Sequence, residues 1–451
     1  MFPFLIAQAT LPLPQEIVQI QEVRELPGSL DRVLVFNSNS PELIQKEGIL
    51  LSTFPPAGKR AKAAHLNFPL QGRFDIFAHH VAKAPAANNL RSLYLGIILH
   101  NPTAKLVQVN ILQGATYLSQ PDAPFKELPA LEENPLSKIF AGPGDRVTNA
   151  ILRGQRHLLP AYIVIPPRQS RMLINLPIPV KTLEPPINGR SVLMRLQSSS
   201  PVYVASLAMY APLGANGNEI APTLAQWQKL LITASLVSPR DRAPTPPEQI
   251  TSKIIYGRVA GIAQGSQSTA QIVDRPNLPY LTIPRSRQAF SYGLSTLPLG
   301  NLGTNQVQSA PLLARYPDTA YSAHGNYGIQ YNLNLPLHNN TGSHQIVTVS
   351  MQTPLKEDRL SKRGLRFLNP PARQVFFRGT VRVAYTDDRG LPQTRYLHLV
   401  QKRGQQGTPL VKLNMKPQDT RLVQVNFLYP PDATPPQVLT IATLGQLTTK
   451  K

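Results

Sequence analysis

The sequence contains no cysteine, a single tryptophan and few charged residues. The lack of cysteine excludes disulfides, thiol catalysis, iron–sulfur clusters and zinc sites built on Cys. Charged residues make up 16% of the chain, whereas about 25% is usual for soluble globular domains. No stretch approaches the roughly 18 uncharged, apolar residues of a membrane-spanning helix. No transmembrane helix is therefore predicted.

Proline and positive charge are in excess. The 451 residues include 46 Pro, and 46 Lys and Arg face 24 Asp and Glu, which gives a formal net charge of +22. Proline removes a backbone donor and clashes inside helices, so its abundance argues against a helix-rich protein. With 42% hydrophobic residues, the chain can build real cores, and its length suggests two or three domains.

Short apolar runs separated by Pro, Gly, Asn and Ser dominate the chain. Runs such as 93–100, 202–210, 345–351 and 375–386 are strand-length and often β-branched, which is typical of β-strands. The segment Asp387–Gly390 between two such runs predicts a hairpin turn. Two further segments, 43–50 and 146–152, fit short helical turns as well as strands.

One helix is predicted, over residues 222–232. Leu224, Trp227, Leu230 and Leu231 recur at helical spacing and define one apolar face. Trp227 is expected to anchor this helix on a sheet rather than to serve as a ligand platform, and the helix is a candidate bridge between the two halves.

These patterns predict an all-β protein of two similar antiparallel β-sandwich-like modules with a short helix between them. The expected organisation is a signal remnant and lead-in over 1–27 and a first module over 28–215. A helix and proline-rich connection over 216–252 then leads to a second module over 253–451.

Short sequence motifs recur in the same order in both halves of the chain. Leu99-His100-Asn101-Pro102-Thr103 returns as Leu337-His338-Asn339-Asn340-Thr341. The period of about 240 residues is far too long for a solenoid or a propeller blade. The recurrence predicts an internal duplication in which His100 and Asn101, and His338 and Asn339, form equivalent turns. A duplicated functional site would also explain the repeated sequence, but a duplicated structural turn is favoured.

The N-terminus predicts export. A short apolar run ends in Ala7-Gln8-Ala9, an A-x-A pattern typical of a secretory cleavage site, although a charged n-region is missing. The mature chain would begin at Thr10, unless the segment is an ordinary N-terminal strand. The expected location is the periplasm or cell envelope.

Five further motifs are 36–42 (FNSNSPE), 48–53 (GILLST), 72–80 (GRFDIFAHH), 140–146 (FAGPGDR) and 205–210 (ASLAMY). Together they resemble a cyanobacterial family of exported proteins that is classed only as a domain of unknown function. The resemblance implies an envelope location in a Gram-negative photosynthetic bacterium and supplies no activity or catalytic residues.

The most suggestive polar cluster is His65, Asp75, His79 and His80. On a strand Asp75 and His79 would share a face, while His80 would point the other way. A metal or catalytic site would need these ligands to converge; hydrogen-bonded structural roles are favoured instead. No G-x-S-x-G elbow or phosphate loop is present. No catalytic residue, metal or cofactor is therefore assigned.

The strongest local charge lies between Lys356 and Arg382, with eight Lys or Arg and two acids. Anionic polysaccharide or lipid head groups are the expected partners, and nucleic acid is not expected because aromatic side chains are not interleaved with this run. The predicted function is a non-catalytic structural or binding role at the cell envelope. The alternative is an envelope polysaccharide hydrolase that uses carboxylates or the His65/Asp75/His79/His80 group. The candidate binding residues are Lys356, Arg359, Lys362, Arg363, Arg366 and Arg373.

Overall fold

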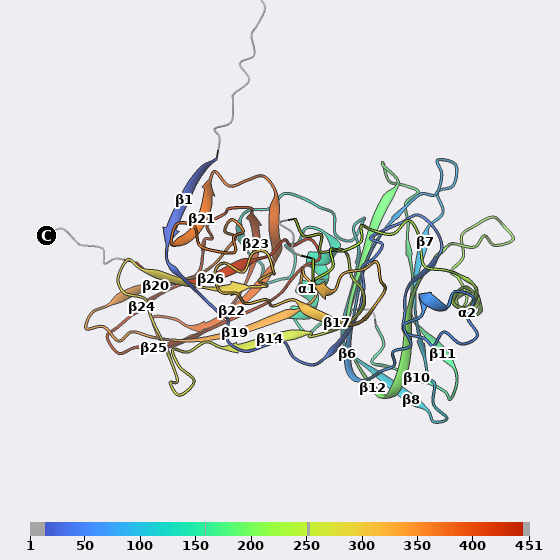
Figure 1. Ribbon diagram of the computed structural model, residues 1–451, viewed down its shortest axis with the longest axis horizontal. Coiled ribbons are helices and arrows are strands. Elements are labelled where there is room, and N and C mark those ends of the chain that lie inside the picture. The colour runs from blue at the N-terminus through green and yellow to red at the C-terminus, as the bar shows by residue number, and fades with distance from the viewer. Residues whose placement is uncertain (1–13, 158, 250–252, 445–451) are drawn as a thin grey trace, which may run out of the picture.

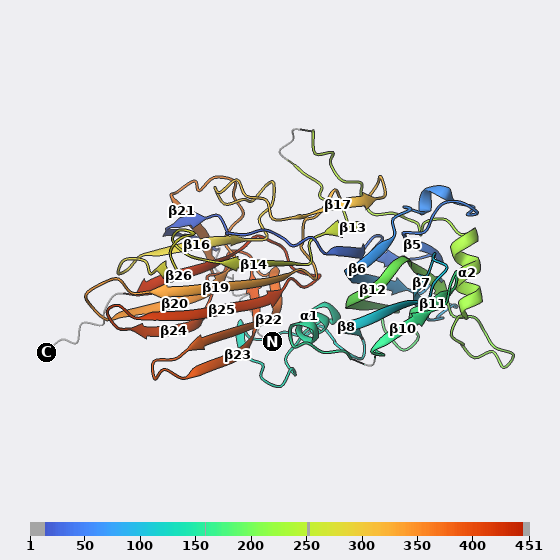
Figure 2. The same ribbon diagram turned by 90° about the horizontal axis from the view of Figure 1, so that it is seen from below.

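The computed structural model describes residues 14–157, 159–249 and 253–444. Nearly all regular structure is β-strand, and the strands gather into two lobes side by side along the long axis of the molecule (Figures 1 and 2). We call the lobe built mainly from β3 to β12 module 1 and the lobe built mainly from β14 to β26 module 2. The all-β, sandwich-like prediction is confirmed.

The first sheet of module 1 has the strand order β10-β8-β12-β6-β3 and continues through β13, β17 and β18. The short strand β4 (Leu43–Ile44) also pairs with β6. The bounds are β3 (Leu34–Ser38), β6 (Leu70–Lys83), β8 (Val107–Leu118), β10 (Tyr162–Ile165), β12 (Ile187–Tyr210), β13 (Ala260–Gln264), β17 (Ala310–Arg315) and β18 (Ser322–Ala323).

The second sheet of module 1 joins β5 (Gly48–Ser52), β7 (Leu93–His100) and β11 (Ser170–Ile178) to the second half of β12. The 24-residue strand β12 therefore belongs to both sheets, because its first half pairs with β6 and β8. Phe36, Ile76, Ile97, Val192 and Val204 are buried in one core between the two sheets. A 3₁₀ turn, η1 (Lys62–Ala64), precedes β6.

The predicted helix is α2 (Leu224–Thr233). It begins with a capping box, in which Thr223 and Gln226 satisfy each other's backbone N–H groups. Trp227 is fully buried among Ile49, Ile98 and Leu207, so it is the core anchor that the sequence predicts. However, α2 covers the outer face of module 1 and does not bridge the lobes (Figure 2).

Module 2 also packs two sheets on a shared core. One sheet has the order β2-β16-β26-β20-β24, and the other has the order β14-β19-β25-β22-β23-β9 with β15 beside β19. The bounds are β2 (Glu22–Arg24), β9 (Leu131–Glu133), β14 (Gln267–Gln271), β15 (Leu281–Thr282), β16 (Ala289–Leu294), β19 (Gln330–His338), β20 (Gln345–Gln352), β22 (Val375–Thr386), β23 (Pro392–Lys402), β24 (Pro409–Met415), β25 (Thr420–Leu428) and β26 (Gln437–Leu444).

Five strands of each module follow the same order and direction. In β10-β8-β12-β6-β3 the first three pairs are antiparallel and the last pair, β6 with β3, is parallel. In β24-β20-β26-β16-β2 the first three pairs are likewise antiparallel and β16 pairs with β2 in parallel. The sheets are therefore mixed rather than purely antiparallel, because β3 and β2 each lie parallel to their neighbour.

The chain crosses between the lobes several times. Strands β1 (Gln15–Ile20) and β2 lie in the segment expected to be a lead-in, yet they pair with β21 (Gly364–Asn369) and β16 of module 2. In the other direction, β13 pairs with β3 of module 1. Strand β9 leaves module 1 to pair with β23. Residues distant in sequence therefore complete each sheet.

The lobes share an apolar interface around helix α1 (Pro143–Leu152). Phe77, Tyr117 and Leu193 of module 1 are buried in the same core as Val147 of α1 and Tyr331 of module 2. Figure 1 shows α1 between the lobes. The helical alternative for 146–152 is thus confirmed. The helical alternative for 43–50 is wrong, because residues 43–44 form β4 and residues 48–50 are the first part of β5.

Candidate functional site

The predicted cluster of His65, Asp75, His79 and His80 does not form one site. His65 Nδ1 is hydrogen-bonded to Ser52 Oγ at 2.9 Å. His80 lies between Ser38 Oγ and the carbonyl of Pro41, both at 2.9 Å. Burial lowers the pKa of each of these imidazoles to about 4, which keeps them neutral. They hold backbone and hydroxyl partners in place.

His79 alone of the four faces a cavity between the modules. Its Nδ1 is hydrogen-bonded to Ser191 Oγ at 2.7 Å, and its Nε2 lies 3.5 Å from Glu42 Oε1. Burial by itself would raise the pKa of Glu42, but His79 and the Arg258 guanidinium outweigh it, so the pKa is lowered. The cavity measures about 410 Å³ and also contains Asp432 in its wall. Among the described residues, no three His, Asp or Glu side chains are placed to share a metal ion.

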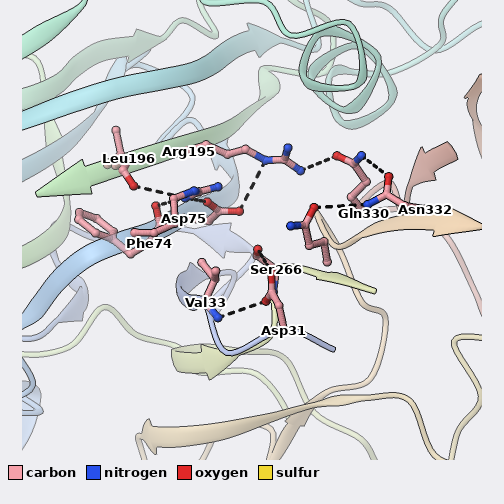
Figure 3. Close-up of polar contacts among 11 residues, drawn as sticks. Asp31, Val33, Phe74, Asp75, Arg195, Leu196, Ser266, Gln330 and Asn332 are labelled. Carbon is pink, nitrogen blue, oxygen red and sulfur yellow. Dashed lines mark hydrogen bonds and ion pairs between the residues drawn. The ribbon is translucent and has the colours of Figure 1, made fainter. Parts of the chain in front are cut away.

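Asp75 lies elsewhere, in a polar network that joins the modules (Figure 3). Its side chain is 2% exposed and contacts the Arg73 guanidinium, and Arg195 Nε lies 3.8 Å away. Burial raises the pKa of Asp75, and the two arginines oppose that rise. Arg195 Nη2 then donates to Gln330 Oε1 of module 2 at 2.6 Å.

The same network continues over the outer face of module 2. Gln330 donates to Asn332 at 2.6 Å, Asn426 donates to the same Asn332 oxygen at 3.0 Å, and Arg382 donates to Asn426 at 2.9 Å. Every charged member has a partner within the network. Asp75 is therefore part of a structural bridge between the modules, and not part of a site shared with the histidines.

The two repeated turns make matching contacts. Asn101 Nδ2 donates to the carbonyls of Lys105, Ile165 and Pro166 at 2.7–3.1 Å. Asn339 Nδ2 donates to those of Ser343, Met415 and Lys416 at 2.9–3.0 Å. Each buried amide nitrogen thus shares its two N–H groups among three backbone carbonyls and ties two loops together.

The histidines before these turns also correspond. His100 is hydrogen-bonded to Ser170 Oγ at 3.0 Å, and His338 to Thr420 Oγ1 at 2.9 Å. Both contacts join neighbouring strands, β7 with β11 and β19 with β25. These four residues therefore hold the sheets together.

The basic run does not face one surface. Lys362 Nζ and Arg366 Nη2 lie 2.6 and 2.5 Å from the carboxylate of Glu16, and so fasten β1 to β21. Lys356 lies 4.9 Å from the ring centre of Tyr256, and Arg378 pairs with Asp432 at 2.8 Å. Arg359, Arg363 and Arg373 are exposed. With Arg382, which donates to Asn426, five of the eight cations of the run therefore serve contacts within the fold.

The Glu16 contacts predict an acid-sensitive N-terminal strand. Hydrogen bonds from Arg366 and Lys362 lower the pKa of Glu16 from 4.5 to about 2. A carboxylate with a lowered pKa stabilises the folded form above its ordinary pKa and loses that effect as the pH falls toward the lowered value. Hydrogen exchange of residues 15–20, corrected for the intrinsic rate, should rise between pH 4.5 and 2. A Glu16→Gln variant should lack this step; the same step in both proteins would contradict the assignment.

An arginine-lined groove lies on module 2. It measures about 850 Å³ and is bordered by Arg24, Arg285, Arg287 and Arg363, with Glu22 and Asp274 as its acids. We call these four arginines and the space between them the arginine groove. Only Arg363 belongs to the predicted basic run. The other three come from β2 and from the loop that follows β15, and no dense run in the sequence marks them.

The acids of the groove are already engaged. Glu22 pairs with Arg24 at 2.9 Å, and Asp274 accepts hydrogen bonds from the Thr282 hydroxyl and backbone N–H. In contrast, Arg285, Arg287 and Arg363 are exposed, and their guanidinium groups have no ion pair within the described part of the chain. The groove therefore presents three unpaired guanidinium groups, together with the Asp274 carboxylate, to a ligand.

Fold and groove together define an all-β protein of two packed sandwich-like modules with a cationic surface groove. Across the regions that the structure describes, no helix is both long and apolar enough to cross a bilayer. The chain belongs to a family of proteins of unknown function (DUF3370), whose model matches residues 21–443. This match confirms the predicted membership in a family of unknown function. No curated protein matches the chain.

Proposed function

We propose that this protein is a non-catalytic protein of the cell envelope that binds an acidic polysaccharide in the arginine groove. The observation that carries the proposal is the set of three exposed guanidinium groups without a carboxylate partner, Arg285, Arg287 and Arg363, around a space of about 850 Å³. Guanidinium groups bind carboxylate, sulfate and phosphate through paired hydrogen bonds. The net charge of +22 adds a long-range attraction for a polyanion.

Binding is favoured over hydrolysis by the His65/Asp75/His79/His80 group, because these four residues do not meet. His65 and His80 are neutral and engaged with hydroxyl and carbonyl groups, and Asp75 is paired with arginines. Hydrolysis of a glycosidic bond needs two carboxyl groups on opposite sides of one bond. The four-residue group offers no such arrangement.

The envelope location is part of the proposal. It is supported by Ala7-Gln8-Ala9 and by the motifs that resemble cyanobacterial exported proteins. Residues 1–13 lie outside the described part of the chain. Cell fractionation followed by N-terminal sequencing tests this location and the expected start at Thr10.

We also propose that the two modules arose by duplication. The matching strand orders, with the one parallel pair at the same end, support this origin. So do the identical roles of Asn101 and Asn339. Superposition of β10-β8-β12-β6-β3 on β24-β20-β26-β16-β2 tests it, because unrelated sheets would not also bring His100 onto His338.

Charge reversal in the groove tests the binding role. The variant Arg285→Glu/Arg287→Glu/Arg363→Glu is expected to bind polygalacturonate roughly ten- to a hundredfold more weakly at low salt, and to lose much of the salt dependence of binding. The matched control is Arg60→Glu/Arg168→Glu/Arg389→Glu, which changes three exposed arginines outside the groove and the net charge equally. The control should retain most of the affinity.

Two outcomes would contradict the proposal. Equal losses in both variants would mean that only the overall charge matters. Binding of anionic vesicles in the groove without binding of polygalacturonate would assign the groove to a lipid surface instead. Calorimetry and vesicle sedimentation distinguish these results, and circular dichroism checks that both variants remain folded.

A further inference from the structure

Three segments of module 1 meet at one end of its sheets. They are the loop between β5 and β6 (residues 53–69), the turn between β7 and β8 (101–106) and the turn that leads from β10 into β11 (166–171). The Arg168 N–H donates to the Thr103 carbonyl at 3.2 Å, which joins the two turns. We call these three segments together the basic tip.

His100, the last residue of β7, shows that the loop and the turns form one surface. Its ring centre lies 5.5 Å from that of Phe54 in the loop, and the Lys59 ammonium lies 5.8 Å from the Phe54 ring centre. Burial lowers the pKa of His100, and the positive charges of Lys59 and Arg168 lower it further. Cations from the loop and from a turn therefore act on the same imidazole.

The basic tip contains positive charge only. Its three segments hold six Lys or Arg and no Asp or Glu. None of the six is in an ion pair within the described part of the chain, and four of them are exposed. A surface of one sign attracts partners of the opposite sign. The six cations are Lys59, Arg60, Lys62, Lys105, Arg168 and Arg171.

The turn between β7 and β8 has an equivalent in module 2 with a different composition. Asn101 donates to the carbonyl of Lys105 as Asn339 donates to that of Ser343. Lys105 therefore corresponds to Ser343, and the next residue, Leu106, corresponds to a histidine. The same turn forms without the lysine and the leucine, so the fold does not require these two side chains.

The turn into β11 gives the same result. Arg168 and its equivalent Gln418 both have a positive φ, of 57° and 61°. In module 2 the following Arg421 pairs with Asp419 at 2.8 Å. Arg171 occupies the corresponding position on β11 and has no carboxylate partner among the described residues. Module 2 therefore compensates a charge that the basic tip leaves uncompensated.

Exposed apolar side chains accompany these cations. Leu106 is 58% exposed next to Lys105. Ile232, at the C-terminal end of α2, is 44% exposed, and its carbonyl accepts the Arg60 N–H at 2.9 Å. Cations beside apolar side chains suit a lipid–water interface, because the cations meet the head groups while the apolar groups enter between them. A polyanion in solution would engage the charges alone.

We propose that the basic tip docks the protein on a membrane surface that contains anionic lipid, with its cations on the head groups and Leu106 between them. The tip shares no residue with the arginine groove. Figure 2 shows α2, which borders the tip, at the end of the molecule remote from module 2. The protein can therefore hold a lipid surface and a polysaccharide at the same time, and either site can fail alone.

Sedimentation with vesicles tests the proposal. The full chain is expected to bind vesicles that contain phosphatidylglycerol at least about tenfold more tightly than vesicles of phosphatidylcholine alone, and to be released as salt is raised. The arginine-groove variant should bind these vesicles as the parent does. Equal binding to both kinds of vesicle, or loss of vesicle binding in the arginine-groove variant, would overturn the proposal.

An exchange of turn residues locates the binding. Lys105→Ser/Leu106→His/Arg168→Gln gives the tip the residues of the module 2 turns, so it should fold as the parent does, which circular dichroism checks. It should bind anionic vesicles roughly tenfold more weakly or worse. The matched control, Lys83→Ser/Leu213→His/Arg389→Gln, removes two exposed cations and a leucine that is 57% exposed elsewhere. Equal vesicle binding by the two variants would overturn the assignment.

Two further measurements distinguish a lipid surface from a soluble polyanion. Leu106→Ser should weaken binding to anionic vesicles about threefold or more, whereas Leu213→Ser, at the other end of β7, should not. The turn-exchange variant should bind polygalacturonate as the parent does. Unchanged vesicle binding in Leu106→Ser would overturn the proposed docking. A loss of polygalacturonate binding as large as the loss of vesicle binding would assign the tip to polyanions in general instead.

Discussion

Replacing Asp145 by alanine is expected to lower the free energy of unfolding by about 3–5 kcal/mol. Asp145 Oδ2 lies 2.7 Å from His398 Nε2, and neither side chain is exposed. The same carboxylate accepts a hydrogen bond from the Ala141 backbone N–H at 2.8 Å. The substitution therefore leaves two buried polar groups, His398 Nε2 and the Ala141 N–H, without their acceptor.

The effect should be large because this pair joins the modules. Asp145 lies in the first turn of α1, which packs on β8 and β12 of module 1, while His398 belongs to β23 of module 2. Urea unfolding followed by circular dichroism measures the change. Glu127→Ala, at an exposed carboxylate outside any ion pair in the described residues, should stay within about 0.5 kcal/mol of the parent. A loss of less than about 1 kcal/mol in Asp145→Ala would show that the pair contributes little.

Replacing Trp227 by alanine should cost about 3–5 kcal/mol. The indole is fully buried, its Nε1 donates to Asn175 Oδ1 at 3.1 Å, and its ring lies directly over Gly96. A Cβ at Gly96 would lie 2.7 Å from the ring, so β7 and α2 fit only because Gly96 has no side chain. Removing the indole leaves a cavity between the helix and the sheet.

The control for this substitution lies on the same helix. Gln228→Ala changes a neighbouring side chain outside the buried face of α2, and its effect on the free energy of unfolding should be within about 0.5 kcal/mol. Trp227 is the only tryptophan, so Trp227→Ala has no tryptophan fluorescence to follow. Chemical denaturation is therefore monitored by circular dichroism, which suits both variants. Equal stability of the two variants would mean that α2 is attached loosely to module 1.

Local features of the sequence predicted local features of the fold. The run Val375–Thr386 and the following Asp387–Gly390 turn identified β22 and its hairpin, because Asp387 Oδ1 accepts the backbone N–H groups of Arg389 and Leu391. Alternating polarity and turn chemistry act over a few residues, so they can be read without tertiary contacts. In contrast, the apolar run at 43–50 was ambiguous, since periodicity alone does not distinguish a short strand from a buried helical turn.

The candidate sites depend on contacts that no local pattern encodes. Arg24, Arg285 and Arg363 converge on one groove from three separate segments. Adjacent histidines on β6, by contrast, have different partners because successive side chains of a strand point to opposite faces. Sequence proximity suggested a cluster there, and strand geometry separated it.

The placement of β1 and β2 determines the order in which the molecule can be completed during synthesis. These strands are made before the other described strands, but their neighbours β16 and β21 are made only after β3 to β12 of module 1. Module 1 can therefore fold while β1 and β2 still lack the strands with which they pair, since domains generally fold as their residues appear. Strands β1 and β2 are consequently among the last of the described strands to be ordered, and they complete module 2 only after β16 and β21 have been made.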